Sequence, residues 1–268
     1  MYHDHSRPNG GRNCSITNSH TLGVTTMTAL LEAPSTDDLA AMSPEQFVEL
    51  LRETLRQPGG GMHNHPLVLE MEAGTATKKQ LALFGTQFYL HISKMLPWIG
   101  LMYVNCPYPN VRATLVKNLA EEELGIITNT AAHPALLLKW LDKLGAPESS
   151  VVDQEQMPQG RRLTEYFEFM GRCRPWYVPL AAIGIGLESF VPDTFRRIVA
   201  AQKKNYGMTD DDLIFYTMHI LADEEHGDEG IEIVSEYVTD PVGRKQVFDC
   251  TVETGRMFYD LWNVYKLA

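Results

Sequence analysis

Apolar residues recur at the 3.6-residue period of an α-helix along most of this chain. Several of these segments open with residues typical of a helix start, such as Ser43 before Pro44, and Pro192 and Pro241 also fit first-turn positions. No segment shows a convincing two-residue alternation typical of a strand. The sequence therefore predicts an all-α protein, with seven or more helices in one bundle over residues 43–268 after a flexible leader over residues 1–42.

The chain is acidic, with 23 Lys and Arg residues against 34 Asp and Glu residues and a formal net charge of −11. Basic residues cluster only in pairs, so nucleic acid is not an expected partner. The most apolar run, residues 95–104, is too short to span a bilayer, and residues 1–26 lack the apolar core of a secretory signal. The four cysteines show no CxxC spacing, which is typical of reduced thiols. We therefore expect a cytoplasmic protein that has a small-molecule substrate and no membrane partner.

The segment 213–234 combines helical periodicity with ionisable side chains on one face. His219, Asp223 and His226 are separated by four and then three residues, so an α-helix projects all of them in one direction. Their apolar neighbours indicate a buried face, where unpaired ionisable groups would cost free energy. A divalent transition metal would compensate that cost, because imidazole and carboxylate are among its ligands. A solvated acidic face that contains a histidine by chance is the alternative.

A second candidate is Glu188, the only charged residue in the apolar segment 179–190, which is expected to belong to a helix from Tyr177 to Phe190. A carboxylate in such a segment is expected to be buried and therefore to need a cation or a hydrogen-bond donor. We favour a metal-binding or catalytic role over a structural one.

Three consecutive glutamates precede His133 in the sequence. On a helical projection Glu122 and Glu123 fall near the edges of an apolar stripe that includes Ile127, while Glu121 points away. Either Glu122 or Glu123 is a candidate interior carboxylate, and a solvated acidic face is the alternative. His133 opens the next expected helix, where an exposed terminal residue is the alternative.

Other polar residues are weaker candidates. Gln87 and His91 lie four apart on one face of a mostly apolar helix and are predicted to orient a substrate. His63 and His65, beside three glycines, are considered as ligands of iron or haem, although residues two apart do not share a helical face.

Taken in chain order, six residues resemble the ligand set of the haem-oxygenase-like diiron oxidases: Glu123, His133, Glu188, His219, Asp223 and His226. These are iron-containing redox enzymes related to thiaminase-like proteins and to pyrroloquinoline-quinone synthase. The resemblance covers residues 45–265, and the spacing to Gly125 and His133 is the reason for choosing Glu123 over Glu122. It implies a haem-oxygenase-like helical bundle in which these six residues hold two Fe²⁺ ions, with O2 as cosubstrate.

The resemblance also implies an O2-activating oxidase or oxygenase, whose relatives oxygenate amine nitrogens, desaturate or cleave amino acids, or decarboxylate fatty acids. The acidic composition favours a small amine or amino-acid-derived metabolite in a biosynthetic pathway. A homodimer and an external electron donor are expected as well. Two alternatives stay open, namely a metal-independent thiaminase-like hydrolase with a cysteine nucleophile and a haem- or metabolite-binding protein of the same fold.

Overall fold

The structure, a computed structural model, describes residues 33–268, apart from the side chains of residues 223–230. The described residues form eleven α-helices and three 3-10 helices and contain no strand. In chain order these are α1 (Thr36–Ala41), α2 (Pro44–Arg56), α3 (Pro66–Ala73), α4 (Lys78–Asn105), α5 (Pro109–Leu124), α6 (His133–Lys143), η1 (Glu148–Ser150), α7 (Pro158–Cys173), α8 (Tyr177–Gly184), η2 (Glu188–Phe190), α9 (Val191–Tyr206), α10 (Ile214–Tyr237), α11 (Pro241–Trp262) and η3 (Asn263–Leu267). The prediction of an all-α bundle is confirmed.

The helical unit begins at Pro34, earlier than the expected boundary at residue 43. Ser35 and Asp38 form a reciprocal capping box that starts α1. Leu39 is fully buried, and its carbonyl accepts a 2.8 Å hydrogen bond from the guanidinium of Arg244 on α11. These contacts attach α1 to the bundle. The remainder of the predicted leader, residues 1–32, lies outside the described residues.

The residues that the sequence suggests as helix starts do lie at the N-terminal ends of helices. Ser43 caps α2 in a box with Gln46 and is followed by Pro44 in the first turn. Thr77 caps the long helix α4 in the same way with Gln80. The local sequence therefore determines where these helices begin.

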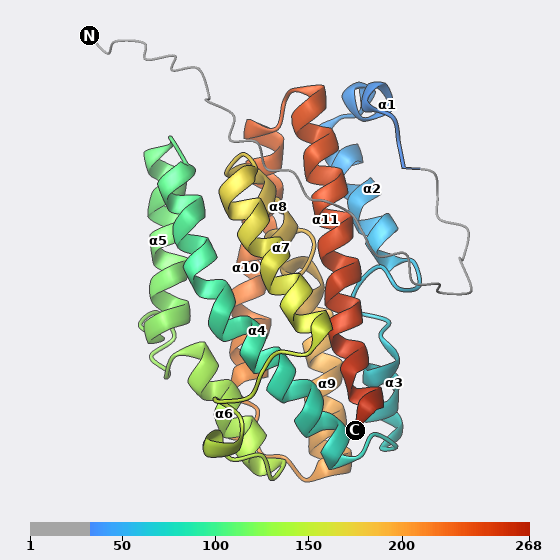
Figure 1. The fold of residues 1–268 in the computed structure, drawn as a ribbon. Coiled ribbons are helices and arrows are strands. Elements are labelled where there is room, and N and C mark those ends of the chain that lie inside the picture. Colours follow the sequence, from blue (N-terminus) through green and yellow to red (C-terminus); the bar gives the residue numbers. More distant parts are fainter. Residues whose placement is uncertain (1–32) are drawn as a thin grey trace. The chain divides into compact units, whose positions relative to one another are not determined.

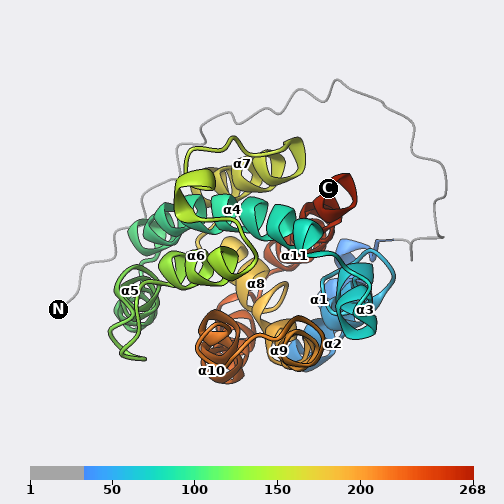
Figure 2. The same ribbon diagram turned by 90° about the horizontal axis from the view of Figure 1, so that it is seen from below.

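The short helix α8 lies near the middle of the bundle (Figure 2), where it packs against α4, α7, α10 and α11. The helices α5 and α6 lie next to α4 on the same side of the bundle (Figure 1). Large side chains such as Trp140 on α6 and Trp262 on α11 are fully buried in the core of the bundle. This arrangement brings the ends of α5 and α6 close to α8, η2 and α10.

The helix predicted from Tyr177 to Phe190 is interrupted, because α8 ends at Gly184 and η2 follows a turn. At Gly186 an added Cβ would lie 2.2 Å from the carbonyl oxygen of Ala182, so only glycine allows this close approach. The stretch 177–206 is apolar and long enough to cross a membrane, but length and composition alone are weak evidence for a membrane span. It is divided into α8, η2 and α9, and 72% of its apolar window is buried inside the protein, as in a core segment.

Candidate metal centre

A cavity of about 40 Å³ lies where six separate elements meet. Its polar lining comes from α5, α6, η2 and α10, and its apolar wall from α4, α5 and α8. The polar residues are Glu121, Glu122, His133, Glu188 and His219, together with Asn118. At about 10–15 Å³ per water on the same measure, the cavity has room for roughly three water molecules. It therefore has room for metal ions and a few water-sized ligands.

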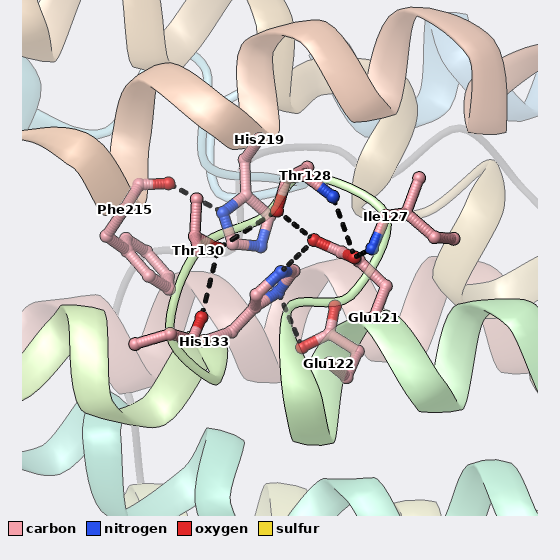
Figure 3. A network of polar contacts seen from close by, with 9 residues as sticks. Glu121, Glu122, Ile127, Thr128, Thr130, His133, Phe215 and His219 are labelled. Carbon is pink, nitrogen blue, oxygen red and sulfur yellow. Dashed lines mark hydrogen bonds and ion pairs between the residues drawn. The ribbon is translucent and has the colours of Figure 1, made fainter.

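The connection between α5 and α6, residues 125–132, lies beside the polar residues of this cavity (Figure 3). Gly125 ends α5 with φ +61°, and an added Cβ would lie 2.5 Å from the carbonyl oxygen of Thr130. The left-handed glycine lets the chain reverse tightly, and the backbone N–H of Thr130 donates to the carbonyl of Gly125 at 3.0 Å. The reversal returns the chain so that His133 lies against the last turn of α5.

Glu121 holds this connection in place. Its Oε2 accepts hydrogen bonds from the backbone N–H groups of Ile127 at 2.7 Å and Thr128 at 3.2 Å, and its Oε1 accepts from the hydroxyl of Thr128. Burial by itself would raise the pKa of Glu121, but the hydrogen bonds from Thr128, Ile127 and His133 hold it below its usual value. Glu121 is only 4% exposed, so the expectation that it points away from the interior is wrong.

The imidazole of His133, 2% exposed, lies between two carboxylates (Figure 3). Its Nε2 lies 3.3 Å from Oε1 of Glu121, and because a carboxylate accepts, this nitrogen carries the hydrogen. Its Nδ1 lies 2.8 Å from Oε2 of Glu122, with which it forms an ion pair when the ring is protonated. In a neutral ring, Nδ1 would therefore present a lone pair to a carboxylate oxygen, and the two groups would repel each other. A cation between them, either a proton or a metal ion, removes this repulsion.

The electrostatics of His133 agree with this geometry. Burial opposes the charged imidazole, but contacts with Glu122 and then Glu121 outweigh it and raise the pKa of His133 above its usual value. The pair of carboxylates therefore attracts positive charge to this point of the cavity.

His219 completes the group from the opposite helix, α10. Its Nδ1 lies 2.7 Å from the backbone carbonyl oxygen of Phe215, and a carbonyl can only accept, so Nδ1 carries the hydrogen. The lone pair of the neutral ring is then on Nε2, which faces the ring of His133 (Figure 3). The ligand atoms of Glu122, His133 and His219 lie within 4.8 Å of one another, the spacing of residues that share one metal ion. Carbonyl or carboxylate contacts on the other ring nitrogen are typical of metal-binding histidines.

The structure brings Glu122, and not the predicted Glu123, into this group. The side chain of Glu123 is exposed, whereas that of Glu122 is 22% exposed and contacts His133. The prediction used Ile127 to place the apolar stripe, but α5 ends at Leu124 and Ile127 is 63% exposed beyond the helix. Without Ile127 the inward face of α5 turns toward Glu121 and Glu122.

Of the other predicted ligands, two line the cavity and two have side chains that the structure does not describe. Glu188 and His219 line the same cavity although they come from different elements, as expected. The helix α10 continues through positions 223 and 226, one and two turns after His219. The side chains of Asp223 and His226 lie outside the described residues, so their role as ligands stays a prediction.

Comparison with known proteins identifies the family. A family model described as an iron-containing redox enzyme matches residues 82–259, which include Glu122, His133, Glu188 and His219. The chain belongs to this family.

Relatives and solved structures agree with the assignment. A 4-aminobenzoate synthase of Nitrosomonas europaea is 26% identical over 70% of this chain and 78% of its own length. A 4-aminobenzoate synthase of Chlamydia pneumoniae is 23% identical over 81% of this chain and 92% of its own length. The fold resembles that of a TenA homologue from Pseudomonas syringae, with a TM-score of 0.71 and 12% identity over 85% of this chain and 96% of that one. It also resembles a domain with a haem-oxygenase-like fold from Shewanella denitrificans, with a TM-score of 0.66 and 19% identity over 83% and 92% of the two chains. The predicted haem-oxygenase-like fold is confirmed.

Gln87 and His91 do not line the cavity that contains His133 and His219, which is the candidate metal cavity. Gln87 accepts a 2.6 Å hydrogen bond from the backbone N–H of Met157 and donates to the carbonyl of Glu155 at 3.3 Å. The fully buried His91 pairs with Thr164 on α7 at 3.1 Å, and burial lowers its pKa to about 3. Both side chains attach α4 to α7 or to the segment that precedes it, and their contact with substrate stays a prediction.

The two histidines beside the glycines also have other roles. His65 is the N-cap of α3, where its Nδ1 accepts from the backbone N–H of Leu67 at 3.1 Å. Its ring is fully buried against those of Tyr259, Trp262 and Tyr265, which leaves no space for a haem. His63 lies in a second cavity, described below.

Among the described cysteines, none lines the metal cavity. Cys106 and Cys250 are free, and burial raises the pKa of both thiols, the opposite of what an activated nucleophile needs. Cys173 is disulfide-bonded, contrary to the prediction of reduced thiols. The geometry therefore gives no support to a thiaminase-like hydrolase with a cysteine nucleophile.

Proposed function

We propose that this chain is an O2-dependent non-haem diiron oxidase or oxygenase that acts on a small amine or amino-acid-derived metabolite. The observation that carries the proposal is the approach of His133 Nδ1 to Glu122 Oε2 at 2.8 Å inside a cavity that His219 and Glu188 also line. Oxygen and nitrogen donors of this kind, with room for further ligands, suit iron that must react with O2. Membership in a family of iron-containing redox enzymes supports the same metal.

The proposed ligands are Glu122, His133, Glu188 and His219, with Asp223 and His226 as further predicted ligands. When bound, the iron supplies electrons for the reduction of O2. The protein residues have separate tasks. Glu121 holds the hydrogen of His133 on Nε2, the carbonyl of Phe215 holds that of His219 on Nδ1, and the apolar wall formed by residues such as Ile99, Leu180 and Ile183 limits access of bulk water.

The substrate class rests on the relatives and the charge of the chain. Relatives named 4-aminobenzoate synthase support a product that carries an amine. The net charge of −11 favours a substrate with a cationic group over a fatty acid. An external electron donor, a homodimer and a cytoplasmic location stay predictions.

The decisive experiment compares neighbouring glutamates on α5. The purified protein is loaded with Fe²⁺ under anaerobic conditions, and bound iron, O2 consumption and organic products, 4-aminobenzoate among them, are measured. We expect Glu122→Gln and His219→Ala to lose iron and O2 consumption, while Glu123→Gln, a matched change at an exposed position, retains both. Equal loss in Glu122→Gln and Glu123→Gln would contradict the proposed site. Iron binding without O2 consumption for any amine or amino acid would contradict the proposed activity.

A further inference from the structure

A second and larger cavity, of about 280 Å³, lies between α2, the segment after it and the start of α9. Its lining includes Arg52 and Arg56 from α2, His63, Phe190 from η2, and Thr194 and Arg197 from α9. It shares no lining residue with the metal cavity. The two are adjacent in the sequence at η2, where Glu188 lines one and Ser189 and Phe190 line the other.

This cavity contains polar atoms that lack partners among the described residues. Thr194 is 0% exposed, and its hydroxyl makes no hydrogen bond. Both ring nitrogens of His63 are buried and also make none. Buried polar atoms of this kind are costly and are normally satisfied by protein, water or a ligand. Because both residues line this cavity, they indicate a site for an acceptor-rich molecule.

The charged side chains around the cavity are arranged in favour of an anion. Arg197 is fixed by a bidentate ion pair with Glu72, at 2.7 and 2.9 Å, and by a hydrogen bond to the carbonyl of His63. Arg56 pairs with the partly exposed Glu49 at 2.9 Å. Arg52 forms no ion pair with a described residue. The carboxylate in the lining, Asp193, is 92% exposed and pairs with Arg196, so it does not neutralise Arg52.

The lowered pKa of His63 is a second sign that the electrostatic potential in the cavity is positive. Burial, followed by the charges of Arg56 and Arg197, lowers the pKa of His63 below its usual value. The ring is therefore neutral at pH 7 and has one N–H to donate. It stacks on Phe190 with ring centres 4.9 Å apart and an interplanar angle of 19°, which supplies a flat apolar wall.

We propose that this cavity is a binding site for a small organic anion that carries a carboxylate or phosphate group. The guanidinium of Arg52, the hydroxyl of Thr194 and the N–H of His63 are the donors for its oxygens. The stacked rings of His63 and Phe190 contact the apolar body of the molecule. The cavity, of about 280 Å³, is large enough for a small organic anion, and the site does not depend on the proposed oxidase activity.

The test uses the full chain and two probes, inorganic phosphate and benzoate, titrated separately by calorimetry at constant ionic strength. We expect saturable one-to-one binding of at least one probe, with a shift of the His63 ring signals in NMR spectra. The tighter probe distinguishes a phosphate site from a carboxylate site. Absence of saturable binding of both probes at millimolar concentration would overturn the proposal.

Three variants separate specific binding from general electrostatics. Arg52→Gln should weaken binding about tenfold or more, because it removes a charge-assisted donor. Thr194→Val should weaken binding several-fold while leaving the ligand-free melting temperature unchanged or higher, because it replaces an unpaired buried hydroxyl with a methyl group of similar size. Arg172→Gln, a change of equal charge on the exposed side of α7, should have no effect. Equal weakening by Arg172→Gln and Arg52→Gln, or a Thr194→Val protein that melts lower and binds as wild type, would show that the cavity has no specific anion site.

Discussion

Replacement of Glu121 by glutamine tests whether a buried carboxylate sets the tautomer of His133, the histidine that we propose as a metal ligand. The carboxylate accepts from four donors, namely the N–H groups of Ile127 and Thr128, the hydroxyl of Thr128 and Nε2 of His133. Glutamine keeps one acceptor oxygen and adds an NH2 group, so two of the four donors then face a donor. The cheapest orientation keeps the oxygen toward the two backbone N–H groups and turns the NH2 group toward Thr128 Oγ1 and His133 Nε2.

The magnitude follows from those two contacts. The hydroxyl of Thr128 is in an exposed residue and can rotate, so the loss at His133 dominates. A hydrogen bond to a charged group contributes about 1.5–3 kcal/mol, and we expect Glu121→Gln to lower the free energy of unfolding by about 2–3 kcal/mol. For a chain of this size that corresponds to a melting temperature lower by roughly 4–12 °C.

The effect on metal binding should be larger than on folding. To avoid the NH2 group, His133 must move its hydrogen from Nε2 to Nδ1, which removes the lone pair beside Glu122 that we assign to the metal. We expect iron affinity to fall roughly 10–100-fold, the usual cost of losing such an outer contact. Thermal unfolding of the metal-free protein, iron competition with a chelator, and ¹⁵N NMR of the His133 ring measure the three effects, with Glu123→Gln as control. Unchanged iron affinity, or a ring that keeps its hydrogen on Nε2, would refute the reasoning.

Three further predictions concern stability and the corrected residues. Gly125→Ala should lower the free energy of unfolding by more than about 2 kcal/mol and weaken iron binding, because alanine is strained in the left-handed backbone and its Cβ would clash with Thr130. The control is Gly145→Ala, at φ +87° with open space around it, which should lower the free energy of unfolding only by the backbone strain of about 1–2 kcal/mol. Acid should destabilise the protein through His91, since its folded-state pKa of about 3 lies below the unfolded value of 6.5: stability is unaffected above pH 6.5 and falls by about 2 kcal/mol on reaching pH 5. Chemical denaturation at both pH values should show a shallower loss for His91→Asn, and an identical loss would count against this cause. Gln87→Ala should lower the unfolding free energy by about 1–2 kcal/mol while leaving the KM of any substrate unchanged, and a raised KM at unaltered stability would instead support the predicted contact of Gln87 with substrate.

Local sequence signals were sufficient for the fold class and for bringing two of the candidate ligands, Glu188 and His219, to one cavity. Caps such as Ser43 and Thr77 act within one helical turn, so the helix starts could be predicted from neighbouring residues. A charged residue inside an apolar segment was also a sufficient signal for Glu188 and His219, which line one cavity. In both cases the physical constraint, whether a backbone hydrogen bond or the cost of burying a charge, acts on residues that are close in the sequence.

The choice among Glu121, Glu122 and Glu123 depends on where α5 ends and how the chain returns to His133. That turn is set by the left-handed Gly125 and by the hydrogen bonds that Glu121 accepts from residues beyond the helix, which a helical projection extended to Ile127 does not contain. The roles of Gln87 and His91 likewise depend on partners near residues 155–164, far away in the sequence. The amino-acid sequence thus determined the helices and the positions of their polar residues. Only the tertiary structure decided which of those residues meet, because meeting depends on the rotation and packing of separate helices.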